Sequence, residues 1–192
     1  MKIILNNIQD YTEPSATLRN VLCHRDSWDR NIFWELSSSE EPVACRIVDF
    51  QLTRYSPPAI DVLFFLYNNI ESPLQRSILL KNLLAHYHQS LKAAFKRLDL
   101  PEDSITKEEF QTDCQRALLP VLILRAICEP LMKLPTGWAR TVRATEQENF
   151  DRYMNLDRTE MIERVSKIDA TYMEKVLFTV QEIMEYFDMK PK

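Results

Sequence analysis

Residues 21–51 read VLCHRDSWDRNIFWELSSSEEPVACRIVDFQ, and this stretch decides the fold. His24, Arg25 and Asp26 stand together, Asn31 follows after four intervening residues, and Asp49 comes after a second apolar run. Residues 32–36 and 43–48 are rich in side chains that favour strands, with a polar turn between them. We therefore predict a β-hairpin that returns Asp49 to the side of Asn31.

The residue types in this stretch match the needs of phosphoryl transfer. That reaction requires an acceptor hydroxyl held in line with the phosphate and metal ions that neutralise the developing charge. In the pattern H-R-D-x-x-x-x-N, the Asp takes the hydroxyl proton, while the Asn and a second Asp after a strand bind Mg²⁺ through oxygen. The pattern predicts Asp26 as the catalytic base, and Asn31 and Asp49 as ligands of the Mg²⁺ that accompanies ATP.

Two segments carry a family resemblance: VLCHRDSWDRNIF at 21–33 and IVDFQLTRYSPPAIDVLFF at 47–65. They resemble the C-terminal lobe of the ecdysteroid kinase-like proteins, which are relatives of choline and aminoglycoside kinases. The resemblance implies a protein-kinase-like fold and ATP-dependent phosphorylation of a small-molecule alcohol, with an ecdysteroid or another steroid as a candidate. It also implies that His24 supports the catalytic loop, and Arg25 stands where many small-molecule kinases of the wider group carry Gly.

Several residues near the motif admit more than one interpretation. Histidine is a common acid–base group in enzymes, but for His24 the structural role is favoured over acid–base catalysis. Asp61 could cap a helix, bind metal or brace the catalytic loop, and support by capping or bracing is favoured. Arg30 could contact phosphate or be a solvated surface side chain, and Trp28 could line the acceptor pocket or pack in the core; neither alternative is favoured.

The chain contains a single glycine, Gly137. A glycine-rich loop that covers ATP phosphates needs several glycines, because the backbone must approach the ligand closely. Only 23 residues precede His24, too few for the small β-rich lobe of a kinase. We expect a truncated chain, with the N-terminal lobe absent. The alternative function is an inactive lobe that binds a ligand or a partner. Without the N-terminal lobe, the apolar face of the cleft would be exposed, so we expect self-association.

Beyond the motif, the spacing of apolar residues is helical. Helices are expected at 61–67, from 72 to about 96, from a capping box at 106–109 through 127, at 158–167 and at 172–187. Loops are expected at Pro130 and 135–138, and a polar link at 145–157. We predict a mainly helical α+β fold, a single lobe over 1–192 with its catalytic and metal site at 21–51 and its helical remainder at 57–189.

Within the predicted helices, two apolar sets are expected to face the core. The first set is Leu74, Ile78, Leu79, Leu83, Tyr87, Leu91 and Phe95, and the second is Val176, Leu177, Val180, Ile183, Met184 and Phe187. Only eight residues, 53–60, separate Leu52 from Asp61, too few for the phosphorylatable loop of protein kinases. This spacing favours a small-molecule acceptor.

Composition excludes several other classes. The net charge of −4 and the lack of a basic run give no footprint for nucleic acid. Cys23, Cys45, Cys114 and Cys128 form no C-x-x-C pair, so buried thiols are favoured over a zinc site at Cys23 and His24. No apolar run is long enough to span a membrane and no signal peptide is visible, so we expect a cytoplasmic protein without membrane contact.

Overall fold

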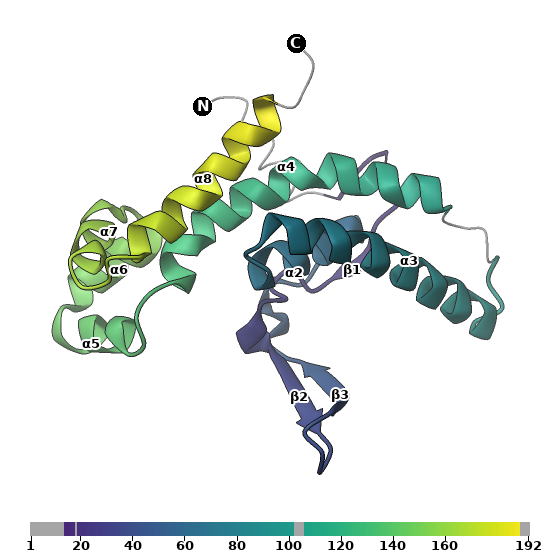
Figure 1. Ribbon diagram of the computed structural model, residues 1–192, viewed down its shortest axis with the longest axis horizontal. Helices are drawn as coiled ribbons and strands as arrows, with labels where there is room; N and C mark the ends of the chain where they lie inside the picture. Colours follow the sequence, from purple (N-terminus) through teal and green to yellow (C-terminus); the bar gives the residue numbers. More distant parts are fainter. Residues whose placement is uncertain (1–13, 18, 102–105, 189–192) are drawn as a thin grey trace. The chain divides into compact units, whose positions relative to one another are not determined.

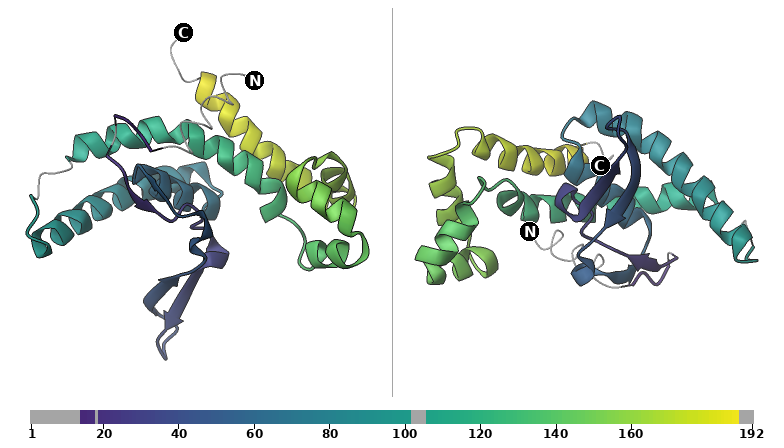
Figure 2. Two further views of the ribbon diagram at one scale, coloured as in Figure 1. Left: turned by 180° about the vertical axis from the view of Figure 1, so that it is seen from behind. Right: turned by 90° about the horizontal axis from the view of Figure 1, so that it is seen from below.

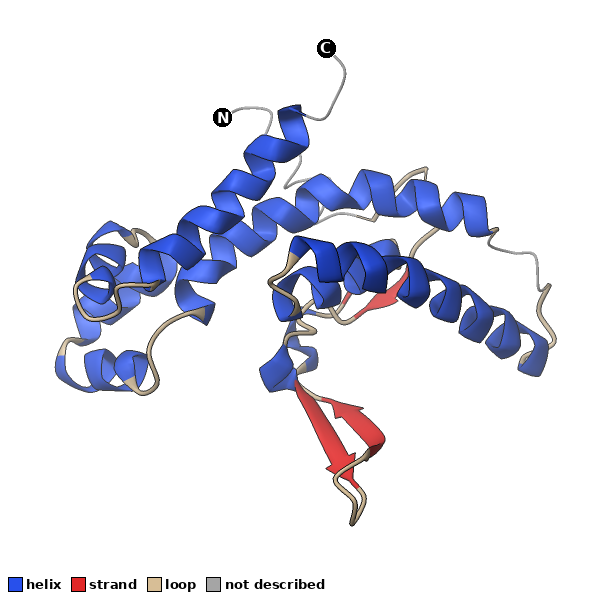
Figure 3. Cartoon of the chain, viewed as in Figure 1, coloured by secondary structure: helices blue, strands red, loops and turns tan. Residues whose placement is uncertain are grey.

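The computed structural model describes residues 14–17, 19–101 and 106–188. The chain divides into two compact units, residues 1–121 and 122–192, and each is described by itself. Helices dominate both, and the strands form two small antiparallel sheets (Figure 3). The predicted mainly helical α+β class with a small hairpin is therefore confirmed. The single lobe over 1–192 stays a prediction.

All of the described strands belong to the first unit. Strand β1 (Val21–Cys23) pairs with β4 (Arg54–Ser56), and β2 (Ile32–Leu36) pairs with β3 (Pro42–Ile47) to form the predicted hairpin (Figure 1). Two short 3-10 helices, η1 (Asp29–Asn31) and η2 (Phe50–Leu52), flank the hairpin. The β1–β4 pair thus brackets the whole motif, and the hairpin lies between its two halves.

Three helices complete the first unit: α2 (Ala59–Asn69), α3 (Pro73–Arg97) and the first part of α4 (Lys107–Met132). The α2 helix supplies six buried apolar side chains, of which Leu63 and Leu66 are almost fully buried. The capping box at the start of α4 is confirmed. The Thr106 N–H donates to Glu109 Oε2 at 2.8 Å, and the Glu109 N–H donates to Thr106 Oγ1 at 3.1 Å.

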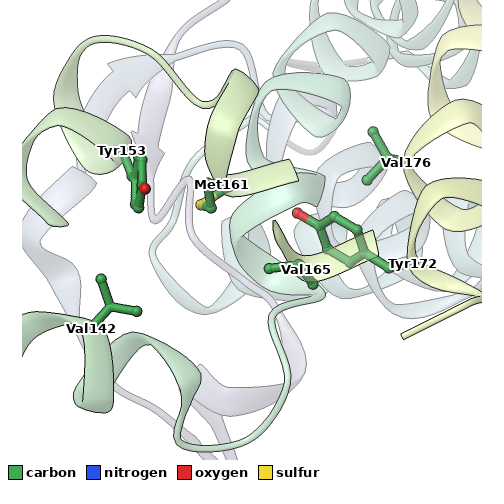
Figure 4. Close-up of a cluster of buried hydrophobic side chains, with 6 residues drawn as sticks. All are labelled: Val142, Tyr153, Met161, Val165, Tyr172 and Val176. Atoms are coloured by element: carbon green, nitrogen blue, oxygen red, sulfur yellow. The ribbon is translucent and has the colours of Figure 1, made fainter. Parts of the chain in front are cut away.

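The second unit packs the end of α4 with α5 (Trp138–Thr145), α6 (Gln147–Asn155), α7 (Thr159–Ser166) and α8 (Tyr172–Asp188). The helices α5, α6 and α7 lie side by side (Figure 2). Side chains from α5, α6, α7 and α8 form a buried cluster (Figure 4): Val142, Tyr153, Met161, Val165, Tyr172 and Val176. The two closing helices expected from the sequence are confirmed as α7 and α8.

Two local expectations in this region are wrong. Pro130 lies within α4, not in a loop. Its carbonyl accepts a hydrogen bond from the Tyr172 hydroxyl at 2.6 Å, which helps hold the last turn of the helix. The stretch 145–157, expected as a polar link, contains α6, because Tyr153 is fully buried and supplies the tertiary packing that a polar sequence lacks by itself.

The expected core faces of α8 and α3 are only partly right. On α8, Val176 is buried, whereas Leu177, Val180, Met184 and Phe187 are exposed. The buried face instead carries Thr179 and Glu182, because the Glu182 carboxylate forms an ion pair with the buried Arg125 guanidinium. On α3, Leu74, Ile78 and Leu79 are exposed, while the four later positions are half-buried. Across the described residues, no helix is both long and apolar enough to cross a membrane.

Candidate active site

The loop at 24–31, predicted to be the catalytic loop, begins where β1 ends and is held by the first turn of α2. Asp61 Oδ2 accepts from the His24 N–H at 2.6 Å, and Oδ1 accepts from the Arg25 N–H at 2.7 Å. Both oxygens of one carboxylate are therefore bonded to consecutive backbone donors of the loop. Charge-assisted bonds of this kind are the strong ones, so Asp61 fixes the loop immediately before Asp26.

Arg25 occupies a backbone conformation that favours glycine. Its φ is 65°, in the left-handed region that side chains with a Cβ rarely adopt. This conformation gives a physical reason for the Gly that many small-molecule kinases carry at this point. Here the Asp61 bond to the Arg25 N–H and the burial of the Arg25 side chain stabilise the strained geometry.

His24 joins the catalytic loop to the segment that carries Asp49. Its Nδ1 accepts from the Asp26 N–H at 3.2 Å, so the ring proton is on Nε2, which donates to the Val48 carbonyl at 2.8 Å. The ring also meets Phe50 edge-on, with centroids 4.7 Å apart. His24 therefore contacts both neighbours of Asp49 in the chain. These contacts link the loop to the segment that carries Asp49.

Asn31 orients Asp26 directly. Its Nδ2 donates to the Asp26 carbonyl and to Asp26 Oδ2, each at 2.9 Å. Asn31 is itself buried at the end of η1. Among the described residues, no donor reaches Asn31 Oδ1, so this amide oxygen remains open to a cation.

The hairpin brings Asp49 to the same place. The Val48 N–H donates to the Asn31 carbonyl at 3.0 Å, so the residue before Asp49 is bonded to Asn31. Asp49 has a φ of 64°, whereas Gln51 lies in η2 outside the left-handed region. The Gln51 side-chain amide donates to Asp49 Oδ2 at 3.4 Å. The strained backbone position of this motif is therefore Asp49.

The electrostatics of Asp26 follow from these neighbours. Burial raises the pKa of its carboxyl, the Asn31 hydrogen bond lowers it, and the negative charge of Asp49 raises it. The net direction is upward. The effect of Asp49 on Asp26 is consistent with two carboxylates on the same side of the hairpin base.

The donor set fits a magnesium ion bound together with a phosphate. Asn31 offers a free amide oxygen, and Asp49 offers an exposed carboxylate. In the part of the chain that the structure describes, no group of three or more His, Cys, Asp or Glu residues could hold a metal. Mg²⁺ is often bound by one or two carboxylates and completed by phosphate oxygens and water, which suits so small a protein contribution.

The Arg30 guanidinium lies 5.1 Å from the centre of the Trp28 ring, in a cation–π contact. Burial raises the pKa of Cys23 to about 11 and that of Cys114 to about 12, so these two are the expected inert thiols. The expectation of burial is wrong for Cys45, which is exposed on β3.

Comparison with known families gives one match. Residues 1–100 match the model of the ecdysteroid kinase-like family. No curated protein sequence matches the chain. The matched range spans just over half of the 192 residues and includes the loop, the hairpin and α2, hence every residue of the site described above.

Proposed function

The chain belongs to the ecdysteroid kinase-like family, and we propose on this basis that it transfers the γ-phosphoryl group of ATP to the hydroxyl of a small molecule. The observation that best supports the proposal is the bonding of Asn31. Its side chain positions Asp26 and its backbone carbonyl is bonded to the residue before Asp49. The base and the second acid are thus held around one amide.

Asp26 would act as the general base. Its carboxylate would accept the proton of the acceptor hydroxyl as that oxygen bonds to phosphorus and the bond to the leaving ADP oxygen breaks. The raised pKa of Asp26 makes it a stronger base than an ordinary aspartate. Asp61 and His24 would support it by holding the loop, without touching the reacting atoms.

Asn31 and Asp49 would hold Mg²⁺. When bound, the ion would neutralise charge on the phosphates of ATP. A glycine-rich phosphate loop is not among these 192 residues, whose single glycine is Gly137. The proposal therefore assigns the base and the metal ligands to this chain, and it assigns no phosphate-covering loop.

The experiment is a transfer assay with γ-labelled ATP, Mg²⁺ and a panel of ecdysteroids as first acceptors. Asp49→Asn should reduce transfer by at least ~10²-fold through loss of metal charge. Asp29→Asn is the matched control, because Asp29 is an exposed aspartate in η1, next to the same site, with no assigned role. Equal transfer by wild type and Asp49→Asn would contradict the assigned roles.

A second candidate function is binding without catalysis. It is supported by the apolar surface on the hairpin and beside it, where Leu22, Trp34 and Phe50 are 76%, 59% and 62% exposed. Large exposed apolar side chains mark interaction surfaces, and we propose self-association through the hairpin and these neighbouring residues. Light scattering over a concentration series should show dimers or larger species that Trp34→Lys disperses. A monomer at every concentration would contradict this proposal.

A further inference from the structure

A cavity of about 370 Å³ lies in the first unit, away from the residues of the active site. It is formed by residues 17 and 19 before β1 and by the first turns of α4. Its charged lining consists of three carboxylates and two guanidinium groups: Glu108, Glu109, Asp113, Arg19 and Arg116. Threonine hydroxyls complete the wall. Small-molecule sites in proteins are of this size or larger, so the volume suits a small ligand.

Asp113 is the unusual member of this lining. Its side chain is 6% exposed, and among the described residues its carboxylate takes part in no hydrogen bond or ion pair. The carboxylate oxygens are not fully buried and are accessible from the cavity. Arg116 attracts it through space but forms no ion pair with it, and burial raises the pKa of the carboxyl. Two other buried charges differ: Arg76 donates to two backbone carbonyls, and Arg125 is paired with Glu182.

An unpaired buried carboxylate lowers the stability of a fold. The neighbouring carboxylate of Glu109 has a structural role, because it accepts a hydrogen bond in the capping box at the start of α4. Asp113 has no such structural use. Its burial without a partner at a cavity wall indicates a position that a cationic group of a ligand would occupy.

The surrounding charges restrict what that ligand can be. In the described part of the chain, no cluster of acidic, His or Cys residues is suited to a metal ion. The guanidinium groups of Arg19 and Arg116 disfavour a simple cation, and the three carboxylates disfavour a simple anion. A molecule with both charges satisfies each side of the cavity. Ammonium and carboxylate groups match these partners, because both form charge-assisted hydrogen bonds.

We propose that this cavity binds a small zwitterion, with its ammonium group on Asp113 and its carboxylate on Arg19 and Arg116. This site shares no residue with the candidate active site, so the proposal does not depend on phosphoryl transfer. Asp113 provides the selective contact. Arg19 and Arg116 are exposed, so they contribute the smaller share.

The first test uses ligand-observed NMR on the full chain with three zwitterions of increasing length: glycine, β-alanine and γ-aminobutyrate. Butylamine and butyrate are the single-charge controls. At least one zwitterion should bind, while neither control binds at the same concentration. Asp113→Asn should weaken that binding at least tenfold. The proposal is overturned if no zwitterion binds, or if Asp113→Asn binds as wild type does.

The second test needs no ligand. Asp113→Asn preserves the shape of the side chain and removes its unpaired charge, so the ligand-free variant should melt about 3 °C higher than wild type. Glu108→Gln is the matched control, because Glu108 is an exposed carboxylate of the same cavity, and its melting temperature should not change. A lower melting temperature for Asp113→Asn would mean that the carboxylate has a structural partner, and it would overturn the site.

Discussion

Asn31 donates its side-chain amide to both the carbonyl and the carboxylate of Asp26, at 2.9 Å each. One amide group thereby fixes the side chain proposed as the base and leaves its own oxygen free. The two roles of Asn31 can be separated by substitutions that keep the oxygen and remove the N–H donors.

Asn31→Asp is such a substitution. It keeps an oxygen for the metal but places a second negative charge beside Asp26, where the wild type has a donor. We expect metal binding to persist and phosphoryl transfer to fall by about 10²-fold, because the base loses its orientation. Transfer rates measured across a Mg²⁺ series would separate the two effects. A wild-type rate at saturating Mg²⁺ would show that the hydrogen bond does not position the base.

From the raised pKa of Asp26 we predict opposite effects of one substitution on activity and on stability. Because the folded-state pKa is above the unfolded value, ionisation of Asp26 destabilises the fold, fully so above the folded-state pKa and not at all below the unfolded value of 3.8. At neutral pH, Asp26→Asn should therefore raise the melting temperature while reducing transfer by ~10³-fold. Calorimetry and the transfer assay together check it. A variant that melts lower than wild type would contradict the sign.

Asp61 should be the residue on which the loop depends most. Asp61→Ala removes the acceptor of two backbone N–H groups, and we expect a loss of about 3 kcal/mol in the free energy of unfolding. Asp61→Asn keeps one carbonyl acceptor and should cost less. Urea denaturation of both variants measures the difference. Equal stabilities for wild type and Asp61→Ala would show that the bonds are not formed in solution.

In the second unit, Glu146 accepts from both terminal nitrogens of Arg164, at 2.7 and 2.8 Å. Hydrogen bonds from Arg164 lower the pKa of Glu146 from 4.5 to about 2. A lowered folded-state pKa contributes stability above pH 4.5 that is lost as the pH falls toward 2. Glu146→Gln should therefore flatten the acid side of the stability profile between these values. Thermal melts at stepped pH measure it, and an unchanged slope in Glu146→Gln would refute the pairing.

The local structure of residues 21–51 could be predicted from the sequence because the residues involved are close together in the chain. The spacing from His24 to Asn31 and the turn at 37–42 are local features, so the hairpin and the proximity of Asp49 to Asn31 could be predicted. The strain at Arg25 and the bond from Asn31 to Asp26 could not be predicted, since both depend on backbone angles that the residue types leave open.

The helical remainder was less predictable where tertiary contacts override local patterns. Phe150, Tyr153 and Met154 have helical spacing in α6, and this signal was outweighed by the polar residues around them. The buried face of α8 includes Glu182, a residue that hydrophobicity alone would predict to be exposed. Its burial depends on the ion pair with Arg125, which lies 57 positions away in sequence, so local patterns could not predict it. The cavity around Asp113 likewise combines residues from two distant segments.

The central claim is that Asp49 and Asn31 hold the metal of a bound nucleotide. Its most direct measurement is a titration of Mn²⁺, as a paramagnetic substitute for Mg²⁺, into the full chain with ATP, followed by electron paramagnetic resonance. Wild type and Asp29→Asn should bind Mn²⁺·ATP with the same Kd, and Asp49→Asn should weaken binding at least tenfold. Equal binding by wild type and Asp49→Asn, or no binding by wild type, would contradict it.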